Sequence, residues 1–256
     1  MGAVIPLQLF IGAGTAVNVL TVAIGSLAGM LIGDRLTERA RGTITDLLGL
    51  VTLVIGGLSL RPLTGEPLNR AVGAGAVLVV ILVALLVGTL AGAGLRLEDR
   101  IEQLADWLRG HLARWVPSTH QRFVDGFVTA TLVFCIGPMT ILGALSDGLG
   151  RGADQLFVKA VLDGFSALAF ASSFGVGVLF SALGVALVQG VFTLLGWALG
   201  DVLPAAQIDA ISVAGGVILL GLGLRLLGLK RVRVAEMLPG LLFAPALVWL
   251  VETIIG

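Results

Sequence analysis

Most of this 256-residue chain consists of seven stretches that contain no Asp, Glu, Lys, Arg or His. They are residues 1–33, 47–60, 71–95, 126–146, 164–200, 210–224 and 237–251. The hydrocarbon layer of a bilayer is about 30 Å thick and needs roughly 20 apolar residues per spanning helix. A soluble domain would have to bury all seven stretches, and a composition of 57% hydrophobic and 12% charged residues leaves too little polar surface for that. The sequence therefore predicts an all-α, polytopic membrane protein.

Charge balance and residue counts exclude several functions. Sixteen basic and sixteen acidic residues give a net charge of zero, so the chain lacks a global positive field for nucleic acid. The single cysteine, Cys135, excludes an internal disulfide and a cysteine metal cluster. The uncharged stretches contain no phosphate-binding loop, zinc pattern or catalytic constellation. We therefore expect no enzymatic activity, no cofactor and no metal centre.

The stretch 164–200 is 37 residues long, which is too long for one spanning helix. Residues 172–177, with the sequence Ser-Ser-Phe-Gly-Val-Gly, predict a break within it. Splitting the stretch there gives eight predicted spans. They cover about residues 6–33, 44–61, 71–95, 124–146, 155–172, 176–199, 208–227 and 237–255.

Residues 97–117 have a different pattern, because apolar residues recur there at helical spacing with Arg, Glu and Asp between them. This pattern predicts an amphipathic helix that lies on the membrane surface. With eight spans, twelve basic residues fall on the side of this linker and four on the other. The positive-inside rule then places the linker in the cytoplasm and both termini outside.

An offset of 167 residues relates the two halves of the chain. It matches nine identical residues in the 33 pairs that begin at residues 28–60, Gly29 with Gly196 and Asp34 with Asp201 among them. The offset maps spans 1–3 onto spans 6–8, and a shift of five spans reverses the direction through the membrane. One transmembrane domain is therefore expected, with inverted three-helix repeats (1–95 and 175–256) around a central span 4–5 hairpin (120–172). Inverted repeats build many secondary transporters, with a site near the midplane at the repeat interface. A duplication that only supplies packed helices is the alternative.

Polar residues inside the predicted spans are the candidates for a binding site. Thr15, Asn18 and Thr21 recur every three residues in span 1, and Gln189 is similarly deep in span 6. Under the offset, Gln189 aligns one helical turn from Asn18, so the two amides share a face of corresponding inverted helices. Interhelical hydrogen bonds alone could explain them. Taken together, these residues are the predicted ligands of a small ion or solute.

Asp163 is the sharpest case, because an ionisable group in hydrocarbon requires a partner or water. Lys159 lies four residues earlier on the same helical face, and Ser166 continues that face. One interpretation is a structural ion pair that neutralises itself. The other is a gated pair, or a proton-accepting carboxylate, that couples or gates transport.

Two further features mark shape and surface. Gly137 and Pro138 in span 4 predict a helix kink. Arg225 and Glu236 flank a basic turn near the cytoplasmic face, where an internal salt bridge or a lipid headgroup contact would account for them.

Several motifs resemble one known family. They are Phe134-Cys-Ile-Gly137, Lys159-Ala-Val-Leu-Asp163-Gly, Phe170-Ala-Ser-Ser-Phe-Gly175 and the run from Gly223 to Lys230 followed by Glu236-Met-Leu-Pro239. Together they resemble the bacterial membrane-protein family called domain of unknown function 554 (YqgA/YdfK-like), over nearly the whole chain. The resemblance implies a multi-pass protein of the bacterial inner membrane, and it implies no substrate.

The leading hypothesis for function is a small transporter or ion-conducting protein. Asn18 and Gln189 would bind the cargo, and Asp163 with Lys159 would couple or gate. The alternative is a non-transporting membrane scaffold or sensor, whose linker and basic turns dock a partner or anionic lipid. The expected partners are the lipid bilayer, a small ion or solute and a second copy of the chain, because small-residue helix faces favour a homo-oligomer.

Overall fold

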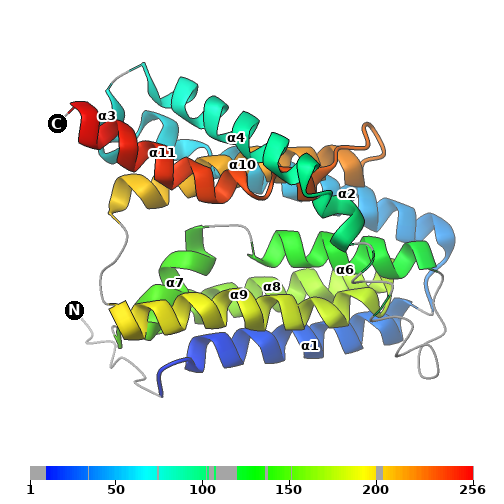
Figure 1. Cartoon of the computed structure of the whole chain (residues 1–256). Helices are drawn as coiled ribbons and strands as arrows, with labels where there is room; N and C mark the ends of the chain where they lie inside the picture. Colours follow the sequence, from blue (N-terminus) through cyan, green and yellow to red (C-terminus); the bar gives the residue numbers. More distant parts are fainter. Residues whose placement is uncertain are drawn as a thin grey trace. The chain divides into compact units, whose positions relative to one another are not determined.

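The computed structural model describes residues 10–33, 35–73, 75–101, 103, 107, 120–135, 138–150, 152–199 and 204–255. Over these residues the chain is helical and contains no strand (Figure 1). The helices are α1 (Ala13–Gly33), α2 (Glu38–Leu58), α3 (Glu66–Val72), α4 (Val77–Gly94), α6 (His120–Cys135), α7 (Pro138–Gly148), α8 (Asp154–Phe174), α9 (Gly177–Leu199), α10 (Ala205–Leu226) and α11 (Gly240–Ile255). Two short 3₁₀ helices, η1 (Arg61–Thr64) and η2 (Val234–Met237), precede α3 and α11.

Seven helices in the described part of the chain are long and apolar enough to cross a membrane, which confirms the polytopic prediction. They are α1, α2, α4, α8, α9, α10 and α11, the last taken together with η2. The predicted break in the 164–200 stretch lies between α8 and α9. Gly175 adopts a φ of +76° there, and its N–H bonds the carbonyl of Ala171. A left-handed residue of this kind ends helices because glycine has no Cβ to clash.

The fourth predicted span, residues 124–146, is two helices rather than one. α6 ends at Cys135, α7 begins at Pro138, and their axes differ by 74°. The bend lies where the sequence predicts a kink, although Gly137 itself is outside the described residues. Proline at the first position of a helix is well placed, because its missing N–H would have no partner there. The Phe134 carbonyl at the end of α6 accepts a hydrogen bond from the Thr140 hydroxyl.

The chain divides into two compact units, each described here by itself. Unit 1 contains α1, α6, α7, α8 and α9, and unit 2 contains α2, α3, α4, α10 and α11. Each unit therefore combines segments that lie far apart in the sequence. Residues 97–117, the predicted amphipathic linker, lie mostly outside the described residues.

In unit 1, α1 packs on α8 through glycines spaced four residues apart. A Cβ added at Gly25 would lie 2.1 Å from the Gly164 carbonyl oxygen, and one added at Gly29 would lie 2.2 Å from that of Leu168. Gly33 approaches Ser172 in the same way. Residue numbers rise together along both helices, so α1 and α8 run parallel. Small residues at this spacing let membrane helices approach closely.

In unit 2, α2 packs antiparallel on α10. Gly49 meets Leu227, Gly56 meets Leu220 and Gly216, and the carbonyl of Gly56 lies 2.8 Å from a Cβ added at Gly216. α4 packs on α11 and η2 through Gly88, which faces Gly240, and Gly92, which faces Glu236. Apart from Gln207, the buried polar residues of this unit, Thr52 and Ser212, give their hydroxyls to carbonyls one turn back.

The contact between α1 and α8 yields the first testable prediction. Gly25→Ala places a methyl group against backbone, which cannot rotate away, so we expect a loss of about 1–3 kcal/mol in unfolding free energy. Gly190→Ala is the matched control, because a Cβ at Gly190 meets nothing within 4 Å. Unfolding in mixed detergent micelles measures both variants. Equal stability of the two would contradict the described packing of α1 against α8.

Candidate functional site

The interior of unit 1 holds a charged cluster at the contact between α1 and α8. The Lys159 Nζ donates to the Asp163 Oδ2 at 2.5 Å, and the Asn18 Nδ2 donates to the same oxygen at 2.9 Å. Asn18 is fully buried, while Lys159 and Asp163 are 7% and 6% exposed. The cluster forms because Lys159 and Asp163 are one turn apart on α8 and the glycine face brings α1 against them.

The structure thus joins two groups of residues that the sequence analysis treated separately. Asn18 was predicted as a ligand and Lys159 and Asp163 as a coupling pair, and all three share one carboxylate oxygen. A charge in hydrocarbon is expensive unless it is paired and hydrogen-bonded. Both donors therefore stabilise the ionised Asp163.

Several buried polar atoms among the described residues of unit 1 have no hydrogen-bond partner. They are the Asn18 Oδ1, both side-chain polar atoms of Gln189 and the Thr131 Oγ1. Gln189 is fully buried on α9. A buried polar atom without a partner costs about 1–3 kcal/mol, and native interiors contain few of them. One of them, the Asn18 Oδ1, belongs to a side chain that already bonds Asp163, so a free acceptor lies at the cluster.

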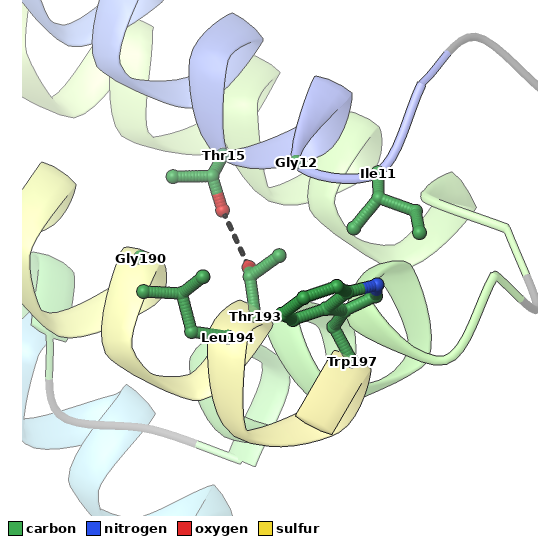
Figure 2. Close-up of a pocket in the computed structure, with 7 residues that line it drawn as sticks. All are labelled: Ile11, Gly12, Thr15, Gly190, Thr193, Leu194 and Trp197. Carbon is green, nitrogen blue, oxygen red and sulfur yellow. Dashed lines mark hydrogen bonds between the residues drawn. The ribbon is translucent and has the colours of Figure 1, made fainter. Parts of the chain in front are cut away.

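The hydrogen bond between Thr15 and Thr193 shows that Asn18 and Gln189 lie at the same depth. The two hydroxyl oxygens are 3.1 Å apart, joining α1 to α9 (Figure 2). α1 and α9 run in opposite directions (Figure 1). Asn18 is three residues after Thr15 and Gln189 four before Thr193, so both lie about 4.5–6 Å further along the same direction. Residues at these spacings share a helix face, which turns both amides toward the same interface.

A hollow of about 430 Å³ lies beside the threonine pair. Figure 2 shows its lining by α1 and α9, and the lining residues are Ile11, Gly12, Thr15, Gly190, Thr193, Leu194 and Trp197. Its walls are mostly apolar, and the polar groups of its lining side chains are the hydroxyls of Thr15 and Thr193 and the indole N–H of Trp197.

Asp147 anchors the start of α1, a contact that the sequence analysis missed. Its buried carboxylate accepts the N–H groups of Gly12, at 3.1 Å, and Gly14, at 3.0 Å. A carboxylate at a helix N-terminus satisfies free N–H groups and the positive end of the helix dipole. The signal was present in the sequence, because Asp147 directly follows an uncharged stretch.

The remaining predicted residues lie as follows. The Thr21 hydroxyl donates to the Asn18 carbonyl, and Ser166 is half-buried on α8. Arg225 pairs with Glu98 at 2.6 Å, and Glu236 with Arg233 at 3.2 Å. Arg225 and Glu236 thus both make ion pairs, but not with each other.

Among the described residues, no three His, Cys, Asp or Glu side chains gather to hold a metal.

These features define a multi-helix membrane protein whose interior holds an ion pair beside unpaired amides. The chain belongs to the family described as "Protein of unknown function (DUF554)", which matches residues 13–249. The expected membership is thereby confirmed.

Similar proteins agree with this assignment. YqgA of Escherichia coli is 32% identical over 237 residues, covering 90% of this chain and 94% of YqgA. The membrane protein YdfK of Bacillus subtilis is 26% identical over 240 residues, covering 93% and 96%. A protein of Syntrophotalea carbinolica named "Putative manganese efflux pump MntP" is 30% identical over 132 residues, covering 47% of this chain and 68% of that protein. No solved structure matches the chain.

The ion pair in the cluster can be tested by stability. Lys159→Met leaves the buried Asp163 without its charge partner, so we expect a loss of about 3–5 kcal/mol in unfolding free energy. Adding Asp163→Leu removes the stranded charge and should recover most of that loss.

Arg70→Met is the control, because Arg70 and Glu66 form an exposed pair with the same spacing, which is worth about 0–1 kcal/mol. Denaturant titration in micelles measures all three proteins. A Lys159→Met protein as stable as the unmodified one would show that the buried Asp163 carboxylate does not depend on Lys159 as its charge partner.

Proposed function

We propose that the protein is an integral membrane transporter of a small inorganic cation, with its site in unit 1 between α1, α8 and α9. The observation that carries the proposal is the unpartnered Oδ1 of the buried Asn18, whose Nδ2 donates to the Asp163 carboxylate, and the Gln189 Oε1 on α9 is a second unpartnered acceptor of unit 1. Neutral amide oxygens and a carboxylate are the ligands that hard cations prefer. Membrane-embedded ionisable groups commonly mark ion pathways.

The related proteins support transport without defining the ion. The name of the Syntrophotalea protein, "Putative manganese efflux pump MntP", describes a transporter of a cation, and the match spans about half of this chain. We infer that this chain moves a cation too, and that manganese belongs in the set of ions to be tried.

Helix directions support eight crossings. α1 and α8 run parallel within unit 1, and α2 and α10 run antiparallel within unit 2. If α6 and α7 together make one crossing, α1 and α8 are spans 1 and 5, while α2 and α10 are spans 2 and 7. Both relations then hold. If α6 and α7 instead returned to the side from which they entered, α8 would be span 4 and α10 would be span 6. α1 and α8 would then be antiparallel, and α2 and α10 would be parallel.

The inverted repeat is supported by contacts between α2 and α10. Under the offset of 167, the contact of Gly49 with Leu227 corresponds to that of Gly216 with Leu60, and both occur. The contact of Gly56 with Leu220 likewise corresponds to that of Gly223 with Leu53. Helices 1 and 6 of the proposed repeats are α1 and α9, so the threonine pair and the two amides lie at the repeat interface.

The charge skew supports an inner-membrane location with both termini outside. A scaffold function would fit a dry interior, as in unit 2, better than unpaired amides in unit 1. We also propose that the chain is not an enzyme, because its sequence contains no recognisable catalytic constellation within the predicted spans. We further propose that copies of the chain associate with one another through their small-residue helix faces.

Transport can be tested with purified protein in liposomes. We expect uptake of at least one ion among Na⁺, K⁺ and Mn²⁺, and at least a tenfold loss in Gln189→Leu, because an apolar side chain cannot replace the amide oxygen. The same change removes two unpaired polar atoms, so stability should stay equal or rise by about 1 kcal/mol.

Gln207→Leu is the matched control, since Gln207 is a buried glutamine of unit 2, and it should leave the uptake unchanged. Uptake that survives Gln189→Leu, Asn18→Ala and Asp163→Asn would refute the assigned site. No uptake of any of these ions would favour the scaffold alternative.

The number of crossings can be tested by labelling cysteines in a Cys135→Ser background. Glu66, at the start of α3, and Lys230, after α10, are both exposed. With eight crossings they lie on opposite sides, so an impermeant maleimide should label Glu66→Cys in intact cells and Lys230→Cys only after permeabilisation. Labelling of both from the same side would mean that α6 and α7 do not cross.

A further inference from the structure

We propose that one end of unit 2 binds the phosphate groups of anionic phospholipids. Four exposed cations form the binding surface, Arg96 and Arg100 after α4 and Lys230 and Arg231 after α10. Together these four residues are the basic end of unit 2. Lipid binding there does not depend on the proposed transport, because all four residues lie in unit 2 and the proposed cation site lies in unit 1.

The segment after α10, orange in Figure 1, turns back on the helix instead of running on into water. Gly228 adopts a φ of +68°, and its N–H bonds the Arg225 carbonyl at 3.0 Å. The N–H groups of Leu229 and Lys230 both reach the carbonyl of Leu224, at 3.0 and 3.4 Å. A left-handed glycine with these two sets of bonds is a common helix stop. It keeps the cations that follow level with the last turn of α10.

Buried valines fix the same segment while its cations stay exposed. Val232 packs on α10, because a Cβ added at Gly221 would lie 3.2 Å from the Val232 Cγ1. Val234 is fully buried. Lys230 and Arg231 are exposed. The backbone that carries these two cations is therefore held in place before any lipid binds, which lowers the entropic cost of binding.

Glu98 joins the two basic segments. Its Oε1 accepts a hydrogen bond from the Arg225 Nη1 at 2.6 Å, and its Oε2 accepts the N–H of Ala235 at 3.0 Å. Glu98 is two residues from both Arg96 and Arg100 in the sequence. The Arg100 N–H bonds the Arg96 carbonyl at 3.0 Å, so these two arginines are one helical turn apart and share a face. The four cations thus belong to one end of unit 2.

The described part of the protein does not neutralise the basic end. Its two segments are residues 95–101 and 225–236. They contain six basic and three acidic residues, which leaves a net charge of +3. Two of the acids are already used, Glu98 by Arg225 and Glu236 by Arg233. Among the described residues, no carboxylate forms an ion pair with any of the four cations. An anion from outside the protein can therefore bind them.

The position of the basic end indicates that this anion is a membrane lipid. α4 and α10 are candidate membrane spans, and the cations begin two residues after Gly94 and four residues after Leu226, where these helices end. The headgroup layer extends about 5–7 Å beyond the hydrocarbon core on each side. Leu229, between α10 and the cations, is 70% exposed. An apolar side chain next to several cations fits a phospholipid, which carries hydrocarbon next to its phosphate.

Binding of two matched lipids to the purified protein tests the proposal. The protein in detergent micelles is titrated with dioleoylphosphatidylglycerol or dioleoylphosphatidylcholine, and native mass spectrometry counts the bound lipids. The two lipids have the same chains, but only the first has a net negative charge. We expect the first to bind about tenfold more tightly. This preference should fall as the ammonium acetate concentration rises, because salt screens exposed charges.

Two double variants test the two segments separately. Lys230→Gln/Arg231→Gln and Arg96→Gln/Arg100→Gln should each weaken the binding of phosphatidylglycerol about fivefold, because each removes two cations from the headgroup layer. Binding of phosphatidylcholine should not change. The lipid comparison and its salt dependence on the unmodified protein test the proposal even if a variant fails to fold.

Arg61→Gln/Arg70→Gln is the matched control, because it removes two exposed cations of unit 2, from η1 and α3, outside the basic end. It should bind phosphatidylglycerol as the unmodified protein does. Equal binding of the two lipids would overturn the proposal, and so would equal losses in the control and the basic-end variants. Full binding by either basic-end variant would also overturn it. Displacement of the lipid by inorganic phosphate would show a site for the free anion rather than for a lipid, which overturns it too.

Discussion

The buried pair of Lys159 and Asp163 is the interaction on which the interior of unit 1 depends. Two charges in hydrocarbon are tolerated only together, and Asn18 contributes a third group to the same carboxylate oxygen. That arrangement requires α1 to approach α8 closely, which the glycines on its face allow. The glycines of α1 therefore determine how closely Asn18 approaches the charged side chains of Lys159 and Asp163.

The two units differ in what they bury. The hydroxyls inside unit 2 bond to their own helices, and its helices meet through Gly and Leu. Unit 1 buries the ion pair and the polar atoms that lack partners. A protein under selection for stability alone gains nothing from unpaired buried amides, since apolar residues of similar size would be cheaper. The cost is understandable if a cation completes the site.

The sequence predicted helices well and tertiary contacts only in part. Uncharged stretches predicted every long helix, and the four-residue spacing predicted that Lys159 would meet Asp163. The hydrogen bond from Asn18 to Asp163 was missed, because it depends on how two distant helices pack, and Gly25, Gly29 and Gly33 were its only trace. The roles of Asp147 and Thr193 were missed for the same reason. α2 begins at Glu38, earlier than its predicted start at residue 44, because charged residues can extend a helix beyond the hydrocarbon.

The most direct test of the account is an experimental structure of the protein soaked with thallium(I), a heavy monovalent cation with a strong anomalous signal. The account predicts one anomalous peak bounded by the Asp163 carboxylate, the Asn18 Oδ1 and the Gln189 Oε1. A structure in which no thallium lies between α1 and α9 at saturating concentration would contradict it.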